Sequence, residues 1–356
     1  MNTRPEATIL VTGASGALGS KLLPLLRGQR VIAVDIQPPA YSDLYAYESV
    51  DLGREAAAKR LTEIVREAEV TDIVHLAFAR AHNPQEADQP TRLWQINVAG
   101  TGRLMEAIAE ANRRVKQVRR LILRSSAQVY GPNPHGALTE TAKFGAHGLP
   151  AAVHSMESER VAQHWAESIE NCAFYILRLA NCAGEGGRSL ILSALRGLPE
   201  NDEKSEGGPR EERLSLPLPL GAGALQKLFQ FLHVEDAARL IAHLLRHPEE
   251  SGQLMVFNVA GRDQSISLAE CVEIAQVKAL RLPQFLCRRA LERRWKKGAS
   301  EVPPEAAPYL YGSCVMETAA LRRFLGGDYR RIIQHANREA LAAAFSTQCI
   351  GPSGAA

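Results

Sequence analysis

A glycine-rich turn between a short strand and a helix constrains the fold of this chain most strongly. Residues 9–11 are apolar and predict a buried strand, and the turn that follows from position 12 has the sequence TGASGALG. Residues 20–26 predict the first part of a helix. Gly13 permits the tight turn, Gly16 lets the backbone approach a pyrophosphate, and Gly19 lets the helix pack closely on the strand. Such a turn presents the free N–H groups of a helix N-terminus to an anion.

An acidic residue ends the next predicted strand. Residues 30–34 are mostly apolar, and Asp35 follows them about twenty residues after the first glycine of the turn. A carboxylate at this place accepts hydrogen bonds from the ribose hydroxyls of a dinucleotide. It also repels the 2′-phosphate of NADP, so it favours NAD. Strand, glycines, helix and acid in this order predict a dinucleotide-binding unit.

Strands and helices alternate along the chain after this unit. Further strands are predicted at 45–51, 72–77, 119–123, 174–179 and 254–258. Helices are predicted at 54–67, 93–111, 157–169, 237–245 and 267–275. The alternation predicts an α/β fold with a Rossmann-type, doubly wound parallel sheet.

The length of 356 residues suits a cofactor domain with an appended lobe, and the 46% content of hydrophobic residues is ample for a sizeable core. We expect an NAD-binding domain at 1–182, with main-sheet strands also from about 229–262. The segments 183–228 and 263–356 are expected to form a smaller C-terminal α/β substrate lobe. Residues 199–213 are charged and lack periodicity, which predicts a mobile insertion.

Composition argues against several classes of protein. Six cysteines are scattered without a CxxC pair, which argues for a reducing compartment and against a zinc site or a disulfide framework. A net charge of +3 is too small to indicate nucleic acid as a partner. No long apolar stretch precedes the first strand, so we expect no signal peptide and a cytoplasmic location. No group of histidines and glutamates has metal-ligand spacing, so no metal is expected.

Further motifs follow the glycine turn and Asp35 in a fixed order. They are Asp51–Leu52, His75–Ala77, Asn97–Thr101, the SSAQVYG sequence at 125–131, Leu177–Arg178 with Asn181, the FLHVED sequence at 231–236, and Asn258–Gly261. Together they make the chain resemble the extended, atypical short-chain dehydrogenase/reductases, in the NAD-dependent epimerase/dehydratase branch.

The resemblance implies a role for each matching position. The pyrophosphate would lie on Gly13, Ser15, Gly16, Ala17, Leu18 and Gly19. The adenosine half of NAD would contact Asp35, Ile36, Asp51 and Leu52, and the nicotinamide half Leu76, Ala77, Asn97, Ser125 and Arg160. Asn181 and Arg188 would contact substrate, and Ser126 would hydrogen-bond the reacting carbonyl or hydroxyl. Asp51 has an alternative role as the N-cap of the helix at 54–67.

The tyrosine that serves this family as general acid/base, with a lysine four residues later, is absent. No tyrosine occurs between Tyr130 and Tyr175, and Lys143 is the only lysine there. Three pairs are candidates for these positions: His154 with Ser158, Ser155 with Glu159, and Met156 with Arg160. The last pair keeps a cation near the nicotinamide ribose without a proton donor. His154 could replace the phenol, because imidazole titrates near neutral pH, or it could be a cap or surface residue.

A basic segment lies near the C-terminus. Residues 282–297 have the sequence LPQFLCRRALERRWKK, with six basic residues and one acid, and Leu291 lies off the main apolar stripe. Two interpretations are open: a helix on an anionic membrane surface or over a hydrophobic substrate, and a solvated helix of the C-terminal lobe.

Two classes of function follow from these observations. The first is an enzyme that acts on a hydroxyl or ketone of a nucleotide sugar, sterol or other lipid, with Ser126 and His154 as catalytic candidates. The second is a non-catalytic NAD-binding sensor or structural subunit, which the missing tyrosine and lysine favour. A small-molecule substrate is the expected partner, and a homodimer is kept as an option.

Overall fold

A seven-stranded parallel sheet forms the centre of the protein. The computed structural model describes residues 7–115, 117–136, 138–169, 171–196, 215–221, 223–247 and 252–346. The strands of the sheet are β1 (Thr8–Thr12), β2 (Arg30–Asp35), β3 (Ala46–Ser49), β4 (Asp72–His75), β5 (Arg120–Ser126), β6 (Ala173–Leu179) and β11 (Leu254–Val259). Their spatial order is β11-β6-β5-β4-β1-β2-β3, and every neighbouring pair is parallel. The predicted α/β class is confirmed.

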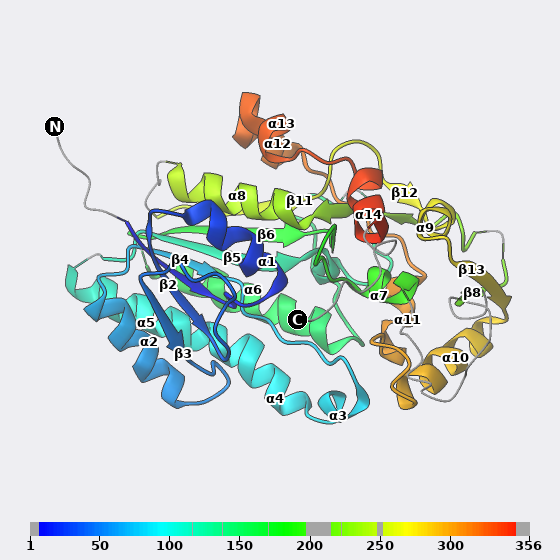
Figure 1. The fold of residues 1–356 in the computed structure, drawn as a ribbon, viewed down its shortest axis with the longest axis horizontal. Helices are drawn as coiled ribbons and strands as arrows, with labels where there is room; N and C mark the ends of the chain where they lie inside the picture. Colours follow the sequence, from blue (N-terminus) through cyan, green and yellow to red (C-terminus); the bar gives the residue numbers. More distant parts are fainter. Residues whose placement is uncertain are drawn as a thin grey trace, which may run out of the picture.

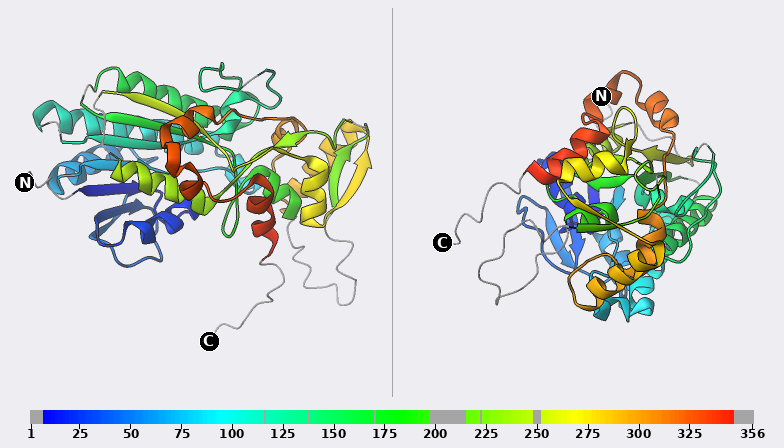
Figure 2. Two further views of the ribbon diagram at one scale, coloured as in Figure 1. Left: turned by 90° about the horizontal axis from the view of Figure 1, so that it is seen from above. Right: turned by 90° about the vertical axis from the view of Figure 1, so that its right-hand side faces the viewer.

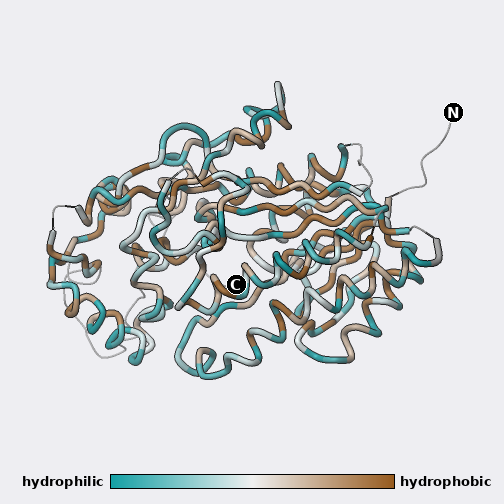
Figure 3. Tube along the Cα trace, turned by 180° about the vertical axis from the view of Figure 1, so that it is seen from behind, coloured by the Kyte–Doolittle hydropathy of each residue, from teal (hydrophilic) through white to brown (hydrophobic). Residues whose placement is uncertain are grey.

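Helices cover both faces of this sheet (Figure 1). On one face α1 (Ala17–Leu22) packs against α8 (Val234–Arg246). On the other face α2 (Ala56–Glu67), α5 (Gly100–Val115) and α6 (Pro150–Ala166) pack side by side. Because both faces are covered, the inner strands are continuous apolar runs, drawn in brown through the centre of Figure 3.

A smaller lobe lies at one end of the sheet (Figure 2). It holds three two-stranded sheets: β7 (Asn181–Ala183) with β10 (Phe231–His233), β9 (Leu228–Phe229) with β12 (Ile266–Ser267), and β8 (Ser215–Pro219) with β13 (Lys278–Leu282). Its helices are α7 (Leu190–Arg196), α9 (Leu268–Ala275), α10 (Gln284–Lys296), α11 (Ala307–Leu310) and α14 (Asn337–Ser346). A separate cluster of buried apolar side chains fills it. Of the stretch 229–262 only β11 joins the main sheet, and the insertion expected at 199–213 lies outside the described residues.

Two helices differ from their predicted bounds. The helix expected from residue 157 begins seven residues earlier, at Pro150, because a proline is well suited to the first helical position. The helix expected at 93–111 begins at α4 (Pro90–Trp94) and passes through a π-turn, Gln95–Ala99, before α5. Single π-turns inside helices often occur at functional sites.

Helix α10 covers the basic segment near the C-terminus. Its buried side chains are Cys287, Leu291 and Trp295, which lie one turn apart on one face. The expectation that Leu291 lies off the apolar stripe is therefore wrong, and this face packs inside the lobe. Phe285 is 64% exposed, and most of the basic side chains of the helix are exposed as well. Among the described residues, no helix is long and apolar enough to cross a bilayer. Contact with a membrane surface stays a prediction.

His75 at the end of β4 is buried in a fixed tautomer. The hydroxyl of Thr101 donates to the Asn97 carbonyl, so it accepts from His75 Nε2, 3.0 Å away. His75 Nδ1 therefore accepts from the hydroxyl of Thr12, 2.6 Å away. Burial, with a smaller contribution from the charge of Arg124, lowers the pKa of His75 to about 4.

Acidification is therefore expected to destabilise the fold. Between pH 6.5 and 4 the unfolded chain binds a proton at His75 that the folded chain rejects. The contribution of His75 is complete above pH 6.5, and the free energy of unfolding should fall by about 3 kcal/mol as the pH drops through this window. Urea titrations at several pH values should show a flatter dependence for His75→Gln. The matched variant His164→Gln, at an exposed position of α6, should keep the wild-type slope. An unchanged slope in His75→Gln would contradict this assignment.

Candidate active site

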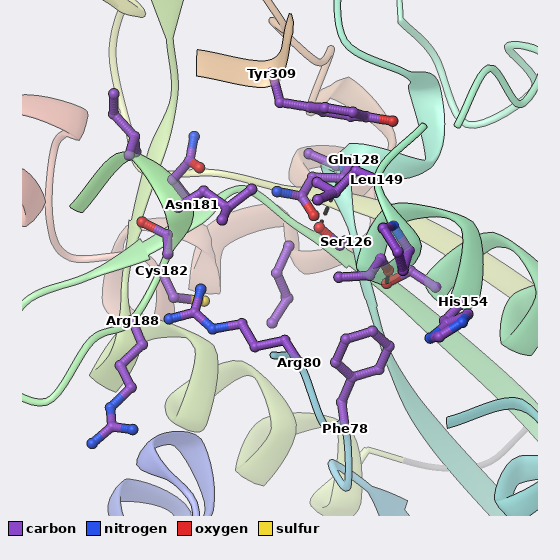
Figure 4. Close-up of a pocket in the computed structure, with 18 of the residues that line it drawn as sticks. Phe78, Arg80, Ser126, Gln128, Leu149, His154, Asn181, Cys182, Arg188 and Tyr309 are labelled. Carbon is purple, nitrogen blue, oxygen red and sulfur yellow. Dashed lines mark hydrogen bonds between the residues drawn. The ribbon is translucent and has the colours of Figure 1, made fainter. Parts of the chain in front are cut away.

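A cavity of about 160 Å³ lies between the carboxyl ends of the main-sheet strands and the smaller lobe. Four predicted residues, Ser126, His154, Asn181 and Arg188, all line it, although they are far apart in the sequence (Figure 4). Tyr309, from the smaller lobe, lines the side of the cavity opposite Arg80. In α/β folds of this type, ligands bind beyond the carboxyl ends of the strands, so the cavity is the candidate active site.

The glycine turn lies against the end of β4. Gly13 has a φ of +70°, and a Cβ on it would lie 2.5 Å from the backbone nitrogen of Ala77. A Cβ on Gly19 would lie 2.4 Å from the carbonyl oxygen of Ala14. A side chain at Gly13 would therefore push the turn away from the end of β4, and one at Gly19 would push α1 away from the turn. Both are expected for a turn that a dinucleotide must approach closely.

Asp35 lies beside the glycine turn at the end of β2. Its carboxylate accepts hydrogen bonds from the Ser15 backbone nitrogen (2.9 Å), the Ser15 hydroxyl (2.7 Å) and the Ile36 backbone nitrogen (2.7 Å). Ile36 is itself 64% exposed, so an apolar surface adjoins this carboxylate. No cation pairs with Asp35 among the described residues. Its acceptor oxygens and the adjoining apolar surface fit the ribose and adenine of NAD.

Replacing Asp35 is expected to change cofactor preference. Wild-type protein should bind NAD more tightly than NADP, because the carboxylate accepts from free ribose hydroxyls and repels a 2′-phosphate. Asp35→Ala should reduce the ratio of NAD affinity to NADP affinity by about tenfold or more. Calorimetric titration of both cofactors measures the change. The prediction fails if wild-type protein binds NAD and NADP equally.

Asp51 follows β3 and forms ion pairs instead of capping a helix, while its contact with the adenine half of NAD stays a prediction. Its carboxylate accepts from the Gly53 backbone nitrogen at 3.0 Å and pairs with Arg92 and Arg54. Burial works to raise the pKa of Asp51, but the bonds to Arg92 and Gly53 hold it below the usual range. Helix α2 has no side-chain N-cap, so the capping alternative is wrong. Arg92 lies on α4, and the pair ties this helix to the end of β3.

Asn97, in the π-turn, joins three parts of the site. Its side chain accepts from the Ala79 backbone nitrogen and donates to the Ala79 carbonyl, both at 2.7 Å. Its second amide hydrogen points to His154 Nδ1, 3.2 Å away. The hydroxyls of Thr101 and Ser158 both donate to the Asn97 carbonyl. Asn97 therefore fixes the loop after β4 and the first turns of α6 relative to each other.

This network also determines what His154 can do. The two bonds to Ala79 fix the orientation of the Asn97 amide, so Asn97 donates and His154 Nδ1 accepts. The imidazole then carries its proton on Nε2. Burial lowers the pKa of His154, with Glu157 opposing this effect, and the ring is neutral at neutral pH. In this state His154 can donate a hydrogen bond from Nε2, whereas its basic nitrogen is already used.

The face of α6 that lines the cavity consists of Pro150, Ala151, His154 and Ser155. None of the three expected pairs brings both members to this face. Ser158 shares its hydroxyl proton between the carbonyls of His154 and Asn97. Glu159 is fully buried beside Arg178, and Met156 packs against the apolar core next to the cavity. The guanidinium of Arg160 lies over the Phe144 ring, outside the cavity lining.

Ala151 and Ser155 form a further pair with the family's spacing, which the sequence alone did not suggest. They lie one helical turn apart, and the Ser155 hydroxyl donates to the Ala151 carbonyl at 3.0 Å. Both line the cavity that holds Ser126. Pro150 is the sequence signal that could have indicated this pair, because a helix that begins there has residues 151 and 155 on one face.

Ser125 belongs to a buried network behind the cavity. Its hydroxyl donates to Glu159 at 2.7 Å, and Glu159 pairs with Arg178 through two nitrogens of the guanidinium. Arg178 also donates to the hydroxyl of Tyr130 at 2.8 Å, and that hydroxyl is 2.6 Å from the Asn258 side chain. Ser125 is therefore not on the cavity wall, and these motif residues connect β5, α6, β6 and β11.

The sequence model of one protein family matches most of the chain. Residues 9–260 match the NAD dependent epimerase/dehydratase family, and they include the glycine turn, Asp35, Ser126 and Asn181. The chain belongs to this family. Membership supports an enzyme of the short-chain dehydrogenase/reductase type with NAD as its cofactor. Within the described residues, no three histidine, cysteine or acidic side chains form a metal site.

Similar proteins agree with this membership. An uncharacterized protein of Mycobacterium tuberculosis is 27% identical over 330 residues, which are 89% of this chain and 79% of that protein. A UDP-glucose 4-epimerase of Yersinia enterocolitica is 27% identical over 204 residues, or 54% of this chain and 59% of the epimerase.

Solved structures show the same fold. The UDP-glucose 4-epimerase of Thermus thermophilus, in complex with NAD, superimposes with a TM-score of 0.66 at 18% identity, covering 97% of this chain and 100% of that one. MoeE5 in complex with UDP-glucuronic acid and NAD gives 0.65 at 21% identity, with 97% and 100% covered. At these identities the comparison establishes the fold, and the predicted Rossmann-type architecture is confirmed.

Proposed function

We propose that the protein is an NAD-dependent enzyme that acts on a hydroxyl or ketone of a nucleotide sugar, with an active site that lacks the family's tyrosine and lysine. The observation that carries the proposal is Ser126, which lines the cavity at the end of β5 within the family-matched residues. Related structures contain NAD with UDP or a UDP-sugar, which supports this substrate class. Sterols and other lipids fit less well, because three arginines, Arg80, Arg124 and Arg188, line the cavity.

The residues around β1 and β2 fit the dinucleotide. We infer that the glycine turn, Gly13, Ser15, Gly16, Ala17, Leu18 and Gly19, holds the pyrophosphate. Asp35, Ile36 and Leu52 would contact the adenosine half of NAD, and Leu76 and Ala77 the nicotinamide half. Bound NAD supplies a hydride acceptor. The close approach of Gly13 to Ala77 leaves backbone rather than side chains at the base of this groove. Asn97 acts here by fixing the loop after β4.

Ser126 is suited to orient the reacting oxygen. Its oxygen accepts from the Gln128 backbone nitrogen at 3.2 Å. Among the hydrogen bonds of the described residues, none uses the hydroxyl proton of Ser126, so this proton is available to a substrate oxygen. His154 Nε2–H is a second donor on the same cavity wall. We propose that these two donors bind the reacting oxygen and polarise it, with proton exchange through water.

The experiment that tests this function is product analysis by NMR. Protein with added NAD is incubated with UDP-glucose, UDP-galactose and their uronic acids, and each sugar is examined for epimerisation or loss of water. Conversion of one sugar, reduced by about 10² or more in Ser126→Ala, supports the proposal.

A non-catalytic NAD-binding subunit is the second candidate. It is favoured by Ala151 and Ser155, because neither side chain on this face of α6 can act as a general acid or base. Tight NAD binding without conversion of any sugar would favour this candidate. Its assembly as a homodimer stays a prediction, which sedimentation would test.

A further inference from the structure

The cavity contains an arginine that pairs with no acidic side chain in the described part of the chain. Arg124 lies two residues before Ser126 on β5, so both side chains point to the same face of the sheet. Ser125, between them, points to the opposite face and bonds to Glu159. The guanidinium of Arg124 lies 4.8 Å from the centroid of the Phe78 ring. Within the described residues, no carboxylate pairs with it and no hydrogen bond involves it.

The surroundings of Arg124 favour an anion beside it. Partial burial lowers the pKa of its guanidinium, and the neighbour that counteracts this effect is the thiol of Cys182, which is itself neutral because burial raises its pKa. Arg124 is partly exposed on the cavity wall, and no carboxylate of the described residues neutralises its charge. A partly desolvated guanidinium that faces a cavity therefore points to an anionic ligand.

Arg80 adds a second cation to the same end of the cavity. Its side chain rises from the loop after β4 into the space between Phe78 and Cys182 (Figure 4). One of its nitrogens, Nη2, is buried without a hydrogen-bond partner. Glu301 approaches Arg80 at 3.7 Å, which is too long for a hydrogen bond. Because Glu301 compensates Arg80 in part, Arg124 is the less neutralised of the two.

The positions of these arginines restrict the anion they can bind. The pyrophosphate of NAD belongs at the glycine turn of β1, and β4 separates β1 from β5. Two strand spacings of about 4.8 Å place that phosphate roughly 10 Å from Arg124. Arg188 is exposed at the cavity rim, where it is available to the diphosphate of a nucleotide sugar. The Cα atoms of Arg124 and Ser126 are only about 7 Å apart.

An anion at Arg124 is therefore close to the oxygen that Ser126 orients. We propose that Arg124, together with Arg80, binds a carboxylate on the sugar ring, so that the substrate is an acidic nucleotide sugar. This inference rests on the proposed function and narrows its substrate class. Guanidinium groups suit this role because their paired N–H groups match both oxygens of a carboxylate.

Calorimetry on the NAD-loaded protein tests the assignment with UDP-glucuronic acid and UDP-glucose, which differ in one carboxylate. Wild-type protein should bind the acid about tenfold or more tightly than the neutral sugar. Arg124→Gln should remove this preference while the affinity for UDP-glucose changes by less than about twofold, and Arg124→Lys should keep part of it. Arg80→Gln should reduce the preference as well. Arg323→Gln, at an exposed position of α12 (Ala319–Leu325), is the matched control and should match wild type.

Three results would overturn the assignment. Equal affinities of wild-type protein for both sugars would reject it and leave the proposed function standing. If Arg124→Gln binds both sugars more weakly by the same factor, Arg124 contacts the diphosphate and not a sugar carboxylate. Failure of wild-type protein to bind either sugar would reject the proposed function together with this inference. Melting temperature and NAD affinity of each variant identify misfolding, and the wild-type comparison needs no variant.

Discussion

The substitution Glu159→Gln is expected to lower the free energy of unfolding by about 3–5 kcal/mol. Glu159 has no exposed surface, and its carboxylate receives hydrogen bonds from Arg178 and Ser125. The amide keeps the size of the side chain but removes its charge. The guanidinium of Arg178, 2% exposed as a residue, then stays in the core without its counterion. The penalty for a buried unpaired charge exceeds the net benefit of the pair itself.

Urea denaturation at neutral pH measures this loss. Glu167→Gln at an exposed position after α6 is the matched control and should change stability by less than about 0.5 kcal/mol. The double variant Glu159→Leu with Arg178→Met should recover much of the loss, because it removes both charges together. A loss below about 1 kcal/mol in Glu159→Gln would show that Arg178 finds other compensation.

A second large effect is expected when the family pair is restored. Ala151→Tyr with Ser155→Lys should raise kcat by on the order of 10² to 10⁴. Both positions line the cavity and lie one helical turn apart on α6. A phenol at 151 would face the cavity that holds Ser126, and a lysine at 155 would lower the pKa of that phenol through its charge. His154 cannot supply this function while its Nδ1 accepts from Asn97.

A matched pair on another face of the same helix controls for this gain. Arg160→Tyr with His164→Lys introduces the same residues at the same spacing on an exposed face, and neither position lines the cavity. The control pair should leave kcat within about twofold of wild type. A restored pair that folds, binds NAD and gains no activity would show that α6 does not present these positions to the substrate. That result would not contradict the proposed NAD-binding residues.

The parts of the site that the sequence predicts well are local in the chain. The glycine turn, Asp35 and the strand before each of them lie within one βαβ unit, where spacing alone relates the residues. The strands of the main sheet were also predictable, because burial on both faces makes them continuous apolar runs. The structure agrees with the expected positions of all these elements to within a few residues.

The parts that were missed depend on contacts across the fold. Asp51 pairs with Arg92, and Asn97 with His154, so the partner of each is set by how separate helices pack. The start of α6 is a different case, because Pro150 carries a local signal for the helix N-terminus. Ser125 and Ser126 are neighbours in one motif, yet the pleat of β5 sends their side chains to opposite faces.

The missing acid partner of Arg124 is likewise a property of the folded chain. The sequence shows an arginine at the end of a strand, which is an ordinary observation. Its significance arises because the fold brings Phe78 and Cys182 against Arg124, while no carboxylate of the described residues pairs with it. The absence of a charge from a neighbourhood becomes visible only when the whole neighbourhood is assembled.

Single-turnover reduction of bound NAD tests the central claim most directly. Wild-type protein loaded with NAD is mixed with each nucleotide sugar, and NADH fluorescence is followed from the first milliseconds. A transient or stable NADH signal is expected with at least one nucleotide sugar, and its rate should be about 10² lower in Ser126→Ala. Stable NAD binding with no NADH signal for any sugar would contradict an enzyme that exchanges hydride with a nucleotide sugar.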